Sequence, residues 1–326
     1  MISGMVEVGL IVLGYNLNLS ITKIVLLGLA YQLGNCVPNP INLNKRGIEI
    51  LSIGGLLSIF TYILSEKYIF LFFSAICLAI VIQSIRSVQK GNVRTSIKRT
   101  FRIIGFMLSY LLNIWMIMAI YGILIYTVFK YSKNSEIAIL KPKIRFINII
   151  MIVHQIHYFS YCYFIILLIV DLLNNGRLYL IGLLFSLGWL TYSYIPEIIK
   201  GKKYEKYLIV GHIYLSIILI MLANAKGIWI VVFWVLTGFG SGTVYCISKI
   251  VEKDIGEGAK DDITFSENIG HILGIVIGLI GYVLFNGEIL VPIYIAIIFA
   301  ISTAILMIIY HTNVRFGGKG IENKKR

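Results

Sequence analysis

The sequence predicts an all-α polytopic membrane protein with about twelve spanning helices in two pseudo-symmetric six-helix bundles. Three observations carry this prediction: an apolar composition, a series of apolar runs that suit a bilayer, and a one-sided distribution of basic residues. Hydrophobic residues make up 58% of the 326 positions and charged residues only 13%, about half the charged share of an ordinary soluble domain. A chain this apolar places much of its surface against lipid.

The spans follow from the positions of polar clusters in this apolar background. A helix needs roughly 20 apolar residues to cross about 30 Å of hydrocarbon, and several segments of about that length are joined by very short turns. The predicted spans are residues 2–17, 20–38, 48–65, 68–86, 99–113, 115–131, 146–171, 177–197, 206–223, 227–248, 267–285 and 288–311. A single kinked helix over 99–131 is the alternative to the cut at Asn113.

Lysine and arginine residues test this division, because they favour the cytoplasmic side of short loops. When the predicted spans are threaded back and forth, all but four of the 29 basic residues fall on one side. The exceptions are Lys23, Lys67, Arg177 and Lys226. Merging the two spans at Asn113 would place the next basic loop on the wrong side, so the pattern favours the cut and puts both termini in the cytoplasm.

The net charge of +14 is therefore explained by basic residues in the predicted cytoplasmic loops. No nucleic-acid partner is predicted. The longest polar stretches divide the chain into an N-terminal bundle, a cytoplasmic linker, a C-terminal bundle and a basic cytoplasmic tail. We expect these parts at residues 1–131, 132–145, 146–312 and 313–326. In both halves a basic loop joins the second and third helices. Matching loops in two halves indicate a parallel internal repeat, which is a common transporter design.

This arrangement resembles the major facilitator superfamily over nearly the whole chain. Members carry a glycine-rich, charged loop between helices 2 and 3. Residues 34–36 followed by 44–47 look like a degraded first copy without the acidic residue, and residues 197–203 look like the tail of the second copy. The glycine-rich segments 238–242 and 267–281 also look like family sequence. The resemblance implies a transporter whose candidate gating-loop residues are Lys45, Arg46, Glu197, Lys202 and Lys203.

The predicted seventh helix carries a polar stripe. At about 100° per residue, His154, His157, Tyr158 and Tyr161 fall on one face, and His157 lies roughly 17 Å into the helix, near the midplane. Transporter substrate sites tend to lie at that depth. The stripe is interpreted either as the wall of a substrate cavity, with a histidine that exchanges protons, or as a hydrogen-bonded seam between helices.

A metal site on this stripe is the third alternative and is not predicted. His154 and His157 can meet on one face, but no carboxylate or thiolate lies nearby in the sequence to complete a ligand shell.

Small residues in the spans are interpreted as packing elements. The four cysteines lie in or beside apolar runs without CxxC spacing, so we interpret them as small buried hydrophobes. The spacing of Gly270, Gly274 and Gly278 gives one helix a smooth face, which indicates a packing surface rather than a binding element.

Three further residues are candidates for the cavity or for ion coupling. Glu7 is the one acid well inside an apolar run of the first half, and is either a protonatable coupling group or an interfacial carboxylate. Gln32 lines an inward vestibule or forms an interhelical hydrogen bond. Tyr245 lines the cavity or belongs to the aromatic belt.

The sequence contains no P-loop, no metalloprotease histidine motif and no paired catalytic carboxylates. We therefore predict neither an enzyme nor a cofactor. The predicted function is a secondary active transporter of a small organic solute in the cytoplasmic membrane, acting by alternating access, with protons as the candidate coupling ion. The expected partners are this solute, protons and the lipid bilayer, and the expected state is a monomer. The alternatives are an intramembrane enzyme acting on lipid or isoprenoid substrates, and a non-transporting membrane protein of the same fold.

Overall fold

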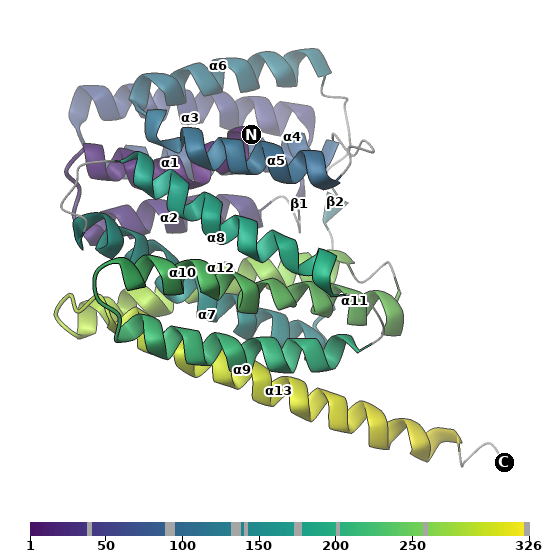
Figure 1. Cartoon of the computed structure of the whole chain (residues 1–326). Helices are drawn as coiled ribbons and strands as arrows, with labels where there is room; N and C mark the ends of the chain where they lie inside the picture. The colour runs from purple at the N-terminus through teal and green to yellow at the C-terminus, as the bar shows by residue number, and fades with distance from the viewer. Residues whose placement is uncertain are drawn as a thin grey trace. The chain divides into compact units, whose positions relative to one another are not determined.

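The described part of the protein is almost entirely helical. The computed structural model describes residues 1–37, 41–88, 95–131, 138–139, 143–172, 178–199, 203–256 and 260–322. The first part of the chain forms α1 (Ile2–Asn16), α2 (Ile21–Cys36), α3 (Lys45–Ser65), α4 (Tyr68–Val88), α5 (Thr95–Met107), the short 3-10 helix η1 (Leu108–Leu111) and α6 (Ile114–Tyr131). The remainder forms α7 (Phe146–Leu172), α8 (Tyr179–Ile198), α9 (Tyr204–Ala223), α10 (Ile228–Ser241), η2 (Gly242–Val244), α11 (Tyr245–Asp254), α12 (Lys260–Leu284) and α13 (Val291–Glu322) (Figure 1).

Within the described ranges, one short ladder interrupts the helical pattern. Strand β1 (Ile41–Asn42) pairs antiparallel with β2 (Ala138–Ile139), and Ile41 lies opposite Ile139. The second strand falls inside the predicted linker 132–145, so part of that linker has regular backbone structure.

Each predicted span corresponds to one helix or one run of joined helices. The prediction of a polytopic helical membrane protein is therefore confirmed. Helices long and apolar enough to cross a membrane are, among the described residues, the seven segments Lys45–Ser65, Tyr68–Ile85, Phe146–Val170, Tyr204–Ala223, Ile228–Lys253, Asp261–Leu284 and Val291–Thr312. Shorter apolar helices occupy Ile2–Asn16, Thr100–Leu111 and Ile114–Lys130.

The chain breaks at the predicted cut between the fifth and sixth spans. Leu112 has an extended backbone after η1, and the Asn113 side-chain oxygen accepts a hydrogen bond from the Met116 backbone N–H at 2.9 Å. This is an N-terminal cap, which satisfies one of the free N–H groups at the start of a helix. Residues 99–131 are consequently two helical segments.

Apolar side chains are exposed on the outer faces of several helices. Leu64 on α3, Val210 on α9 and Ile298 on α13 are 86%, 63% and 62% exposed. In water such exposure would be unfavourable, but in a bilayer these side chains face hydrocarbon while the helical backbone satisfies its own hydrogen bonds.

The helices form two compact units. One contains residues 1–142 and 162–187, and the other contains 143–161 and 188–326. Each has its own apolar core, which includes Val6, Leu27 and Leu78 in the first unit. The core of the second unit includes Ile150 and Ile247, and α9 runs beside α13 within it (Figure 1). The domain boundaries expected from the sequence stay a prediction.

Candidate functional site

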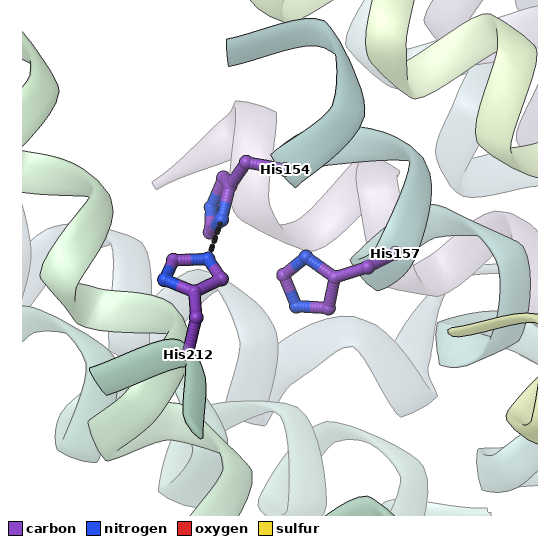
Figure 2. Close-up of side chains that lie close together, drawn as sticks. All are labelled: His154, His157 and His212. Atoms are coloured by element: carbon purple, nitrogen blue, oxygen red, sulfur yellow. Dashed lines mark hydrogen bonds between the residues drawn. The ribbon is translucent and has the colours of Figure 1, made fainter. Parts of the chain in front are cut away.

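Three histidine side chains converge inside the second unit. His154 and His157 project from α7 and His212 projects from α9, with their rings turned toward one another (Figure 2). One ring nitrogen of each can be chosen so that all three lie within 4.8 Å of one another, and all three residues are buried. We call these three residues the histidine cluster.

The His154–His212 pair is connected by a short contact. The Nδ1 of His154 lies 2.7 Å from the Nε2 of His212. The other ring nitrogen of His212, Nδ1, lies 2.9 Å from the Leu208 carbonyl oxygen, one helical turn earlier on α9. Because that carbonyl can only accept, it favours the tautomer with hydrogen on Nδ1 and leaves a lone pair on Nε2 of His212. His154 then donates to His212 through Nδ1.

His157 is less well satisfied than the other two. Its Nε2 lies 3.5 Å from the Ser241 hydroxyl at the end of α10, which is the long limit of hydrogen bonding. Its Nδ1 is buried and has no hydrogen-bond partner among the described residues. A buried polar atom without a partner is uncommon in native proteins and calls for a physical explanation.

Glycine residues bring α9 close to the helices that surround the cluster. A Cβ at Gly211, next to His212, would overlap the side chain of Thr243 in η2. A Cβ at Gly240 would lie 2.7 Å from the Leu215 Cβ on α9 and 2.9 Å from the Gly211 carbonyl oxygen. The glycine-rich segment 238–242 therefore acts in close helix packing, and this packing sets Ser241 beside the cluster.

Aromatic rings extend the polar stripe along α7. Tyr158 stacks on Trp234 of α10 with ring centroids 6.3 Å apart, and Tyr161 meets the same indole edge-on at 5.8 Å. Tyr161 and Trp234 are fully buried, while Tyr158 is half-buried. The predicted stripe thus divides into a histidine part facing α9 and an aromatic part facing α10.

The opposite side of α7 packs against α12. Gly270 and Gly274 allow this contact, because a Cβ at either position would press on Gln155 or Phe159. Two titratable groups of α12 face this side of α7. Glu267 accepts a hydrogen bond from Gln155 at 3.3 Å, and the His271 ring lies 3.9 Å from the Phe159 ring.

The histidine cluster has no acidic partner in the described part of the chain. No Asp or Glu side chain there forms an ion pair or a hydrogen bond with the three rings. The cluster is therefore a buried, nitrogen-rich site without an acidic partner among the described residues. Its chemistry suits hydrogen bonding to a solute or coordination of a soft or borderline metal ion.

The other predicted cavity residues lie apart from the cluster. Glu7 on α1 forms an ion pair with Arg102 on α5 at 2.8 Å, within the first unit. Gln32 on α2 lies 3.4 Å from the Tyr163 hydroxyl, also within the first unit, and accepts a hydrogen bond from Asn35. Tyr245 begins α11, and the Lys249 ammonium lies 5.7 Å from its ring centroid. These contacts leave the assigned roles as predictions.

The predicted gating-loop residues lie at helix ends. Lys45 starts α3, donates to the Phe129 carbonyl at 3.1 Å and lies 4.0 Å from Glu49, while Arg46 is exposed. Glu197 is exposed near the end of α8, and Lys203 directly precedes α9. Lys202 lies outside the described residues.

His212, which supplies the third imidazole, was not among the residues predicted from the sequence. It lies 55 positions beyond His157 in the printed sequence, on a different helix. The available signal was its position within an apolar span, directly after Gly211. A polar residue beside a small residue in a spanning helix marks a helix–helix contact. The sequence alone does not pair α9 with α7.

Comparison with known proteins shows the fold. Neither a protein-family model nor a curated protein sequence matches this chain. Among solved structures, a point mutant of the nucleoside transporter NupG matches with a TM-score of 0.64 and 11% identity, over 95% of this chain and 98% of that chain. The human organic anion transporter MFSD10 matches with a TM-score of 0.58 and 12% identity, over 94% and 83%.

A bacterial homologue of the iron transporter ferroportin, in an outward-facing state, matches with a TM-score of 0.51 and 11% identity, over 95% of this chain and 98% of that chain. The likeness thus covers most or nearly all of the length of these structures. The chain therefore shares the fold of these three structures, in agreement with the transporter-like fold that the resemblance in its sequence implied.

Proposed function

We propose that this protein is a secondary transporter that moves a small organic solute across the cytoplasmic membrane by alternating access. The observation that supports this most is the near full-length fold similarity to structures of two transporters and a transporter homologue. Both termini lie in the cytoplasm in this proposal, as the basic loops predict.

The stripe on α7 contributes solute contacts in this proposal. His157 lies at mid-depth of a spanning helix, and Tyr158, Tyr161 and Trp234 form an aromatic wall next to it. Polar side chains at this depth are costly and are usually functional. Aromatic rings with a polar edge hold small organic molecules by stacking while hydroxyl and imidazole groups set their orientation.

Proton coupling would use either His157 or Glu7. His157 is a candidate because imidazole titrates near physiological pH in water. Glu7 is a candidate because it is a carboxylate inside an apolar helix, where Arg102 is its counter-ion. The protein acts as a monomer in this proposal, because transporters built from an internal repeat contain both repeats in a single chain.

The first experiment identifies the solute. Purified protein in detergent is screened by thermal shift against nucleosides and organic anions, the two organic ligand classes that the names of the similar structures suggest. A compound that stabilises the protein is then offered to proteoliposomes with and without an imposed pH gradient. Uptake that responds to the gradient supports proton coupling, and absence of uptake of any stabilising compound argues against transport.

The second experiment tests the stripe. We expect His157→Ala to abolish uptake although the protein still inserts into liposomes, because the imidazole contributes to the solute site. His311→Ala is the matched control, since His311 lies on α13 away from the cluster. Normal uptake by the His157 variant would remove the α7 stripe from the mechanism.

A further inference from the structure

We propose that His154, His157 and His212 bind one divalent transition-metal ion of the zinc class, with an exogenous anion as the fourth ligand. This inference goes beyond the proposed transport function and does not depend on it, because metal binding is measured on protein in detergent. It rests on the geometry and chemistry of the histidine cluster.

The spacing of the three rings is close to what a metal ion requires. Zinc lies about 2.0–2.1 Å from each imidazole nitrogen in a tetrahedral site, so the nitrogens lie about 3.4 Å apart. In this protein one nitrogen of each ring can be chosen so that all three lie within 4.8 Å of one another. The Nδ1 of His154, which donates to Nε2 of His212 across 2.7 Å, would have to lose that hydrogen before it could act as a ligand. The proposed site requires small side-chain rotations at the three helical positions, which would bring the lone pairs to a common centre.

His212 already has the orientation of a metal-binding histidine. Metal ligands of this kind almost always donate their second ring N–H to a carboxylate, a backbone carbonyl or water, which fixes the tautomer. The Leu208 carbonyl plays that part for Nδ1 of His212 at 2.9 Å. Nε2 then carries the lone pair that can bind a metal ion, and it faces the cluster.

His157 distinguishes a metal site from a simple hydrogen-bonded seam. A seam accounts for the contact between His154 and His212, in which one ring donates to the other. It leaves Nδ1 of His157 buried and without a partner among the described residues. Coordination of an ion by this nitrogen would satisfy it and would connect all three rings.

The imidazole ligands and the lack of an acidic side chain in the cluster indicate which class of ion would bind and what its fourth ligand would be. Mg²⁺ and Ca²⁺ prefer oxygen ligands, whereas imidazole suits zinc, copper, iron and nickel. No described acidic side chain pairs with the three rings, so a bound ion would keep its full +2 charge in an apolar span. Because a buried charge is costly unless it is compensated, an anion is expected at the open position, as in open three-histidine zinc sites.

The test uses the full-length chain, purified in detergent, with its affinity tag removed. Zn²⁺ binding is measured by isothermal titration calorimetry and by metal content after dialysis. We expect one equivalent per chain, a higher Tm with Zn²⁺, and no binding of Mg²⁺ or Ca²⁺. Wild-type protein that retains no Zn²⁺ at micromolar concentration, or that binds Mg²⁺ equally well, would overturn the proposal.

Three single variants and one control locate the ion. His154→Gln, His157→Gln and His212→Gln should each lower Zn²⁺ affinity at least tenfold, whereas His311→Gln should bind as wild type does. Size-exclusion profiles and Tm without metal show whether each variant is folded, and only folded variants are compared. Unchanged affinity in a folded His212→Gln variant would overturn the assignment, and so would loss of binding in His311→Gln. If no cluster variant folds, the proposal is judged on the wild-type protein alone, by its Zn²⁺ stoichiometry and its preference for Zn²⁺ over Mg²⁺ and Ca²⁺.

Cobalt tests the open position. Co²⁺ in a four-coordinate nitrogen site absorbs visible light far more strongly than hydrated Co²⁺, so the substituted protein reports its own coordination. We expect this strong band in wild-type protein, its loss in His157→Gln, and a shift of the band when azide is added. A strong band that azide leaves unchanged would overturn the exogenous fourth ligand, and a weak band like that of hydrated Co²⁺ would overturn the site.

Discussion

Gly278 of α12 lies directly against the backbone carbonyl of Ser160 on α7, so closely that a Cβ at this glycine would overlap the carbonyl oxygen. Gly274 and Gly270 make similar contacts one and two turns earlier on α12. The three glycines form the smooth face that the sequence predicted as a packing surface. They hold one side of α7 and leave the opposite side, with His154 and His157, to face α9.

Substitution of Gly278 by alanine should therefore destabilise the second unit. The added methyl group meets backbone rather than a flexible side chain, so relief requires α7 and α12 to move apart. We expect a loss of about 1–3 kcal/mol, typical of overpacking, measured by SDS-titrated unfolding in mixed micelles. Gly122→Ala is the matched control, because a Cβ at Gly122 on α6 meets nothing within 4 Å. Equal stability of the two variants would contradict the close contact.

The break between α5 and α6 depends on one amide side chain. Asn113 caps α6 by accepting the Met116 N–H at 2.9 Å. Asn113→Ala should cost about 1 kcal/mol, the usual value of an N-terminal cap, while Asn113→Asp should retain most of the stability because it keeps the acceptor. SDS-titrated unfolding of both variants measures the difference. A wild-type stability in Asn113→Ala would mean that helix packing alone fixes the break.

The sequence predicted this break and most helix ends because local signals determine them. Apolar length and basic loops report where each helix crosses the membrane, and the spacing of His154 and His157 places them on one face of one helix. His212 and Arg102 were not connected to His157 and Glu7, because those contacts depend on which helices pack together. Small residues such as Gly211 mark a helix contact, but they do not name the partner helix.

A buried hydroxyl stabilises the first unit. Tyr121 on α6 is fully buried, donates to the Ser74 carbonyl at 2.6 Å and lies 3.1 Å from the Ser74 hydroxyl. Tyr121→Phe should cost about 1 kcal/mol, the net value of a typical hydrogen bond, as measured by SDS-titrated unfolding. Tyr126→Phe is the control, because Tyr126 on the same helix is 62% exposed and its substitution should change stability by less than about 0.5 kcal/mol. A larger loss in the control would contradict this explanation.

The ion pair between Glu7 and Arg102 connects α1 to α5, and its energy can be measured separately from any role in transport. The two side chains are only 15% and 31% exposed and lie 2.8 Å apart. An exposed pair contributes about 0.2–1 kcal/mol, whereas loss of one partner of a fully buried pair costs about 3–5 kcal/mol. This partly buried pair should lie between these limits.

A double-mutant cycle of Glu7→Gln, Arg102→Gln and the combined variant isolates that energy. We expect a coupling of about 1–2 kcal/mol, with the combined variant losing less stability than the two single losses added together, because each single variant already removes the attraction between the two side chains. Unfolding is followed at low and high salt, and a partly buried pair should lose little of its coupling at high salt, since it is screened less than an exposed pair. A coupling near zero would show that the contact does not stabilise the first unit and would return Glu7 to the interfacial carboxylate that the sequence offered as an alternative.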